Sequence, residues 1–96
     1  MVHYALMKFH PGALTDEYRA LIRHTYEELP KLVPSILSAQ VFENCYVRDS
    51  NYDLMFRVEV DAPEHLPDYL NHPLHVKMAQ DTAPLRCAPI VSFDHL

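Results

Sequence analysis

Residues 52–60, YDLMFRVEV, alternate apolar and polar side chains with a period of two. This pattern is typical of a half-buried β-strand, in which one face packs in the protein core and the other does not. One face carries Tyr52, Leu54, Phe56, Val58 and Val60, and the other carries Asp53, Met55, Arg57 and Glu59. A second apolar-rich stretch, residues 36–47, precedes it, and the short polar residues RDSN between the two predict a turn. The sequence therefore predicts a β-hairpin that needs a second layer on its apolar face.

Helical patterns and two further strands flank this hairpin. Residues 15–33 repeat apolar positions every three or four residues, with Thr15 placed to cap the helix and Pro30 expected to kink or separate its last turn. Asp61 in DAPE resembles a capping residue, and Pro67 and Pro73 divide the region that follows. We expect a short first turn, a piece around residues 68–71 and a helix that begins at Pro73. Residues 2–9 and 87–94 are predicted to be strands.

The order strand, helix, strand, strand, helix, strand predicts one domain over residues 1–96. Two right-handed crossovers fold this order into a ferredoxin-like βαββαβ protomer, an α+β fold whose helices cover one face of a four-stranded antiparallel sheet. The first strand is apolar on both faces, with His3, Ala5, Met7 and Phe9 on one and Val2, Tyr4 and Leu6 on the other. Since the helices cover only one face, we expect a homodimer in which a second copy covers the other.

Charge and hydropathy exclude several classes of partner. The 96 residues carry a net charge of −5 and no block of basic residues, so we expect no nucleic-acid partner. No apolar run approaches the length of a membrane span and the first residues lack a signal-peptide pattern, so we expect a cytoplasmic protein with no membrane contact. With Gly12 as the single glycine, the chain holds no GxGxxG phosphate loop, and a nucleotide cofactor bound by one is excluded.

The segment YLNHPLH, residues 69–75, holds the candidate acid/base residues. Tyr69 and His75 within hydrogen-bond reach of each other could share a proton, and His3 in the first strand is a further candidate that faces a pocket. The alternative is structural: His72 caps the helix begun by Pro73, and His75 is a core histidine bonded to a backbone carbonyl. The spacing of His72 and His75 is a weak metal signal, because two ligands alone fall short of a tetrahedral site. We therefore expect no metal and no cofactor.

Several stretches together resemble one family, the stress-responsive A/B barrel (Dabb) domains. They are KFHPG, ELPKLVPSI, YDL, YLNHPLH and IVSFD, and they span essentially the whole chain. The resemblance implies a dimeric α+β barrel. One plant member, olivetolic acid cyclase, closes an aromatic ring on a linear polyketide. Its acid/base pair corresponds to Tyr69 and His75, and its pocket wall implies the substrate-binding residues His3, Ala5, Met7, Ile22 and Tyr26.

Two functions remain open from the sequence. The first is a homodimeric protein that binds a small, largely apolar, oxygen-bearing molecule between sheet and helices without chemistry. The second is a cofactor-free enzyme, similar to a polyketide cyclase or a lyase, in which His75 is the base and Tyr69 its partner. The stripe that includes Ile22 and Tyr26 is also explained by core packing alone.

Overall fold

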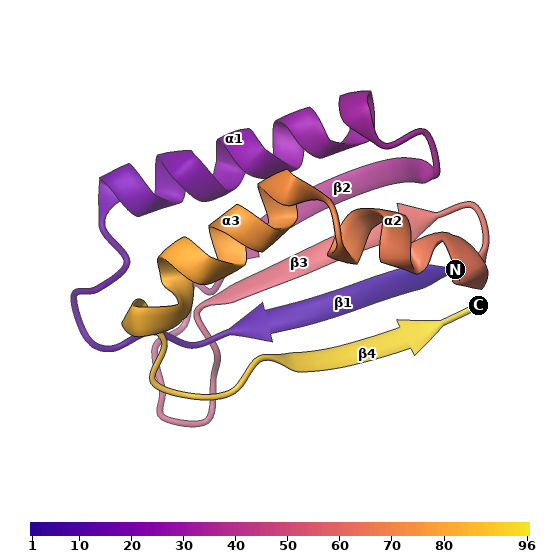
Figure 1. The fold of residues 1–96 in the computed structure, drawn as a ribbon. Helices are drawn as coiled ribbons and strands as arrows, with labels where there is room; N and C mark the ends of the chain where they lie inside the picture. The colour runs from indigo at the N-terminus through magenta and orange to yellow at the C-terminus, as the bar shows by residue number, and fades with distance from the viewer.

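The computed structural model describes residues 1–96 and contains one four-stranded antiparallel sheet in the order β2-β3-β1-β4. Its strands are β1 (Val2–Met7), β2 (Ile36–Glu43), β3 (Leu54–Val60) and β4 (Val91–His95). The helices are α1 (Asp16–Leu32), α2 (Leu66–Leu70) and α3 (Pro73–Thr82), with short 3₁₀ turns at Pro63–His65 and Ala83–Leu85. All three helices lie on the same face of the sheet, with α1 beside α3 (Figure 1). The predicted ferredoxin-like α+β fold is confirmed.

The two faces of the sheet differ as the period of two predicts. On β3, the helix-facing residues Leu54, Phe56, Val58 and Val60 are buried, whereas Met55, Arg57 and Glu59 between them remain partly exposed. β1 lies between β3 and β4, so its buried residues His3, Ala5 and Met7 belong to the same covered face. The core of the protein therefore forms between this face and the helices.

Helix α1 begins where the sequence indicates, and it continues beyond Leu29, where a change in the helix was expected. The Thr15 hydroxyl accepts a hydrogen bond from the Tyr18 amide at 3.4 Å, which confirms the predicted N-cap. Of the two alternatives expected after Leu29, a separate last turn is wrong, because the helix runs through Pro30 to Leu32. Leu29 and Val33 are both buried, so packing holds the last turn although the proline removes one backbone donor.

The prolines divide the second helical region as expected. Pro67 lies at the start of α2, and Pro73 is the first residue of α3. The predicted capping role of Asp61 is wrong, since no side chain caps the turn at Pro63–His65. The Asp61 carboxylate instead contacts the His65 imidazole at 2.5 Å, one helical turn further on.

Strands β2 and β4 are shorter than predicted because local contacts form loops at their ends. Asn44 and Asn51 hydrogen-bond through their side chains at 3.1 Å, and Arg48 donates to Asn51 at 2.7 Å, so residues 44–53 form a loop rather than extending the hairpin. The last strand begins at Val91 instead of Cys87, after a segment that contains Pro89.

The second face of the sheet has no helix on it. It exposes the large apolar side chains Phe42, Val91 and Phe93, of which Phe93 is 64% exposed. Arg57 and Glu59 on this face lie 3.7 Å apart and form an ion pair within the protomer. No helix of the chain is both long and apolar enough to cross a membrane.

Candidate functional site

A cavity of about 350 Å³ lies between the helix-facing side of β1 and β4 and the segment around α2 and the start of α3. Its walls bring together residues that are up to 91 positions apart in the chain. The lining residues are His3, Ala5, Met7, Tyr26, Phe56, Leu66, Tyr69, Leu70, His75, Ile90, Ser92 and Asp94. We call this space the Tyr69 cavity.

The break between α2 and α3 positions His75. Pro73 begins α3, and His72 at the N-cap accepts the Leu74 amide through Nδ1 at 3.1 Å, which confirms the structural role expected of His72. His75 Nδ1 lies 2.8 Å from the Leu70 carbonyl oxygen. The predicted bond to a backbone carbonyl is thus present, and His75 also lines the cavity.

This hydrogen bond determines which His75 nitrogen can accept a proton. A carbonyl oxygen only accepts, so Nδ1 carries the hydrogen and Nε2 holds the lone pair of the neutral ring. Burial lowers the pKa of His75, the bond to Leu70 opposes that shift, and the nearby His3 lowers the pKa further. The His75 imidazole is therefore neutral at physiological pH.

Tyr69 and Tyr26 form a buried hydroxyl pair beneath the sheet. Tyr69 is 0% exposed and Tyr26 is 4% exposed, and their hydroxyl oxygens are in direct hydrogen-bond contact. Burial raises the pKa of Tyr26 well above its ordinary value, and the neighbouring Tyr69 raises it further. Burial also raises the pKa of Tyr69, although the hydrogen bond with Tyr26 opposes the shift. Both phenols are neutral at physiological pH and act as donors rather than bases.

His3 on β1 contacts Asp94 on β4, the residue directly opposite it in the sheet. The distance from His3 Nδ1 to Asp94 Oδ1 is 2.5 Å, and the His3 side chain is buried whereas the Asp94 side chain is 44% exposed. The carboxylate orients the imidazole, because Nδ1 must carry the hydrogen that it donates to an ionised acceptor.

The aromatic rings converge on Tyr69. Its ring centroid lies 4.5 Å from that of His75, 5.9 Å from that of His3 and 6.0 Å from that of Tyr26. The structure therefore places six of the seven sequence-predicted site residues on the cavity wall. Ile22 is not among them, because it is buried in the core away from this cavity.

Sequence reasoning missed Asp94 and Ser92 on β4, together with the apolar wall of Phe56, Leu66, Leu70 and Ile90. A signal for the two polar residues was present in the last strand. Ser92 and Asp94 alternate with Val91 and Phe93, and they pair with Ala5 and His3, so they lie on the helix side of the sheet although this edge strand is exposed. Polar side chains that alternate with apolar ones in this way are candidates to line a site at the edge of the core.

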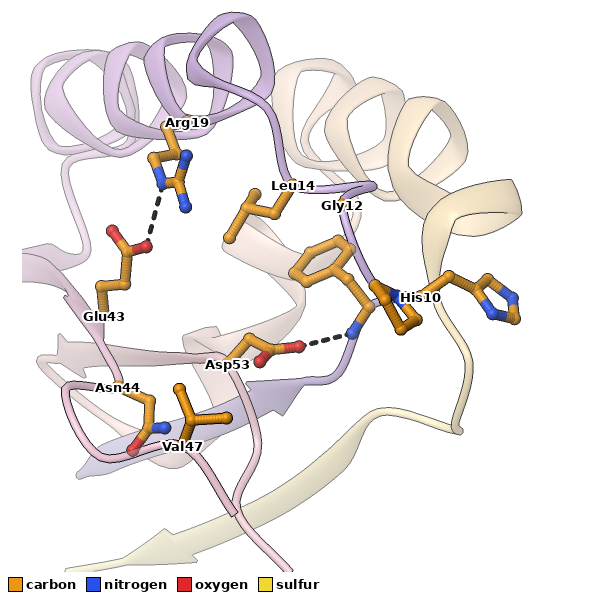
Figure 2. A pocket seen from close by; sticks show the side chains of 10 residues that line it. His10, Gly12, Leu14, Arg19, Glu43, Asn44, Val47 and Asp53 are labelled. Carbon is orange, nitrogen blue, oxygen red and sulfur yellow. Dashed lines mark hydrogen bonds and ion pairs between the residues drawn. The ribbon is translucent and has the colours of Figure 1, made fainter. Parts of the chain in front are cut away.

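A second cavity, of about 280 Å³, lies where the loop after β1 meets the ends of β2 and β3 (Figure 2). Arg19 on its wall donates to Glu43 at 2.9 Å and to Asp16 at 3.1 Å, and Asp53 accepts the Phe9 amide at 2.7 Å. His10 points away from the space between Leu14 and Asp53. These polar groups hold the loops together, so the Tyr69 cavity remains the candidate site.

Fold and site together define a ferredoxin-like α+β protein in which two buried tyrosines and a partly buried histidine meet between sheet and helices. The sequence profile of the Stress responsive A/B Barrel Domain family, abbreviated Dabb, matches residues 1–95. The chain belongs to this family. No curated protein sequence matches the chain.

Solved structures of other proteins share the fold over almost the whole chain. A dimeric ferredoxin-like protein of unknown function from Thermobifida fusca YX has a TM-score of 0.76 at 20% identity, covering 98% of this chain and 89% of its own. A putative antibiotic biosynthesis monooxygenase from Bacteroides thetaiotaomicron has a TM-score of 0.79 at 16% identity, with coverages of 100% and 87%. A hydroxynitrile lyase from Passiflora edulis has a TM-score of 0.72 at 10% identity, with coverages of 96% and 89%. At these identities the likeness establishes the fold.

Proposed function

We propose that this protein binds a small, largely apolar molecule that carries an acceptor oxygen in the Tyr69 cavity. The observation that carries the proposal is the buried hydroxyl pair. Two phenols hold two O–H hydrogens, and the contact between Tyr26 and Tyr69 uses one of them. No other group of the protein hydrogen-bonds either hydroxyl, so the second hydrogen is available to an oxygen of a ligand.

The size and lining of the cavity support the same ligand class. A volume of about 350 Å³ lies at the lower end of the range for small-molecule sites, about 300–1,000 Å³. Met7, Phe56, Leu66, Leu70 and Ile90 supply an apolar wall around the few polar groups. Apolar walls with a small number of oriented hydrogen-bonding groups are typical of ligand sites.

Acetophenone, a neutral aromatic ketone, is a suitable first probe. Titration followed by protein NMR should shift resonances of cavity residues, and the double variant Tyr26→Phe/Tyr69→Phe should weaken binding several-fold, because it removes the free donor, worth about 1 kcal/mol, whereas either single variant leaves one hydroxyl hydrogen available. Tyr46→Phe is the matched control, because Tyr46 is 70% exposed and does not line the cavity. Shifts confined to surfaces outside the cavity would refute the proposal. Native mass spectrometry of freshly purified protein would test for a co-purified ligand.

A second function, cofactor-free acid/base catalysis, is favoured by the geometry of His75. With its hydrogen held on Nδ1 by the Leu70 carbonyl, neutral His75 offers Nε2 as the base. Nε2 would take a proton from the carbon next to a carbonyl, while Tyr69 donates to the carbonyl oxygen as negative charge develops there. The resulting enol or enolate carbon can attack a second carbonyl, as in an aldol-type ring closure, and the proton on His75 returns to the new alkoxide.

Binding and catalysis predict different effects of His75→Gln. If the protein only binds, affinity falls modestly, because glutamine still offers an amide to the cavity. If His75 is the base, turnover of a true substrate falls about 10²- to 10⁴-fold. Unchanged turnover would exclude His75 as the base. The same acid/base pair would serve a lyase, the reaction class printed in the name of the Passiflora edulis neighbour.

The functional unit that we propose is a homodimer formed through the uncovered sheet face. Phe42, Val91 and Phe93 are exposed on this face, and the Thermobifida fusca neighbour is described as dimeric. Phe93→Glu should shift the sedimentation coefficient at micromolar concentration from dimer to monomer, because it places a charge in an apolar interface. Val47→Glu, in the exposed loop, is the control. A wild-type monomer would refute the proposal.

A further inference from the structure

The polar groups that line the Tyr69 cavity comprise hydrogen-bond donors, acceptors and one carboxylate. Its donors are hydroxyls, namely the unused hydrogen of the tyrosine pair and the hydroxyl of Ser92. Against these it presents Nε2 of His75 and Nε2 of His3 as acceptors and the carboxylate of Asp94 as a negative charge. No lysine or arginine is among the twelve lining residues.

We propose that Asp94 makes the cavity select neutral carbonyl compounds and reject the corresponding carboxylates. This inference rests on the proposed binding function and adds the charge of the ligand to it. A carboxylate that reaches the tyrosine pair leaves its water, meets no cationic side chain and lies near a second negative charge. A ketone or aldehyde of the same shape accepts the same hydrogen bond without that repulsion.

Asp94 is held where it can exert this effect. Its contact with His3 at 2.5 Å fixes the carboxylate at the cavity wall, and His3 lies 5.9 Å from Tyr69 between ring centroids. Asp94 and the tyrosine pair line the same cavity, and charges separated by less than about one Debye length, roughly 8–10 Å at physiological salt, are screened incompletely by solvent ions. The Asp94 side chain is 44% exposed, and His3 is its one ion-pair partner in the protein.

The size of the selection follows from Coulomb's law. Two unit charges about 8 Å apart in a medium of effective dielectric constant about 20 repel each other enough to weaken binding roughly tenfold to a hundredfold. The hydrogen bond that a phenol makes to an ionised acceptor is stronger than one to a neutral acceptor, and this offsets part of the repulsion. We therefore expect a net preference for the neutral ligand of about tenfold.

The test compares acetophenone with benzoate, which replaces the methyl group of the ketone by a carboxylate oxygen. Dissociation constants come from NMR titration of the wild-type protein at pH 8, about 1.5 units above the pKa of free imidazole. Acetophenone should bind about tenfold more tightly than benzoate. Equal affinities, or tighter binding of benzoate, would overturn the inference while leaving the proposed binding function standing. If neither compound perturbs the cavity residues, both proposals fail.

Asp94→Asn removes the charge but keeps an oxygen that can accept from His3. The ratio of the two dissociation constants should then fall toward one. Asp81→Asn is the control, because Asp81 pairs with Lys77 on the outside of α3 and does not line the cavity, so the ratio should stay at its wild-type value. An unchanged ratio in Asp94→Asn would overturn the role of Asp94. The wild-type ratio tests the selection even if this variant fails to fold.

Discussion

Removing either hydroxyl of the Tyr26–Tyr69 pair should lower the free energy of unfolding. Removing the second hydroxyl as well should lower it no further. In Tyr26→Phe, the Tyr69 hydroxyl keeps its buried position and loses its partner, and the reverse holds for Tyr69→Phe. Leaving a buried polar group unsatisfied costs about 1–3 kcal/mol. In the double variant both polar groups are absent and two phenyl rings occupy the same space, so the total cost should be no larger than that of one single variant.

Urea unfolding followed by circular dichroism measures the four free energies of this cycle. All proteins must be compared at one protomer concentration, because dimerisation would couple stability to concentration. The expected coupling between the two positions is about 1–3 kcal/mol, and each kcal/mol corresponds to roughly 4–8 °C in Tm for a domain of this size. Tyr46→Phe, on an exposed residue, should change the free energy of unfolding by less than about 0.5 kcal/mol. Additive costs of the two single changes would show that the hydroxyls do not depend on each other, and would remove the basis of the proposed binding site.

Three further predictions follow from the same structure. Because folding lowers the pKa of His75, the unfolded chain binds more protons than the folded chain near pH 6, so the free energy of unfolding should fall as the pH drops from about 6.5 to the folded pKa. In urea titrations, His75→Gln should reduce this pH dependence. A His75 pKa above 6.5, measured by NMR titration, would contradict the prediction. His72→Ala removes the side-chain cap of α3 and should cost about 0.5–2 kcal/mol by urea unfolding, whereas His24→Ala on the outer face of α1 should cost little. Phe56→Ala should cost about 3–5 kcal/mol, because Phe56 is fully buried and packs on Tyr26 at 4.7 Å between ring centroids; a cost below 1 kcal/mol would mean that the core is not packed as described.

Much of the fold could be predicted because its signals are local. The alternation on β3, the Thr15 cap and the division at Pro67 and Pro73 each depend on neighbours within a few residues, and all were confirmed. Local rules also produced an error at Asp61, which has the spacing of a capping residue, yet its carboxylate contacts His65. Pro30 has the chemistry of a helix breaker, yet α1 continues through it to Leu32.

The candidate site was only partly predictable. Tyr69 and His75 lie in one short proline-bent segment, so the sequence could place them near each other. Asp94 escaped notice because its partner His3 is 91 residues away and the two meet through the register of β1 against β4. Ile22 was expected in the pocket because the family resemblance implies it, whereas the structure buries it in the core, as the alternative explanation of core packing expected.

The order of strands and helices, the two sheet faces and the helix ends were already contained in the amino-acid sequence, since side-chain periodicity and capping depend on the backbone close at hand. Packing over long distances along the chain was needed for the rest: it joined the hydroxyls of Tyr26 and Tyr69, placed Asp94 against His3, and left a space of about 350 Å³ among them. Whether distant side chains meet or leave a gap depends on strand register and on how all neighbouring side chains pack together. No local sequence pattern determines this packing.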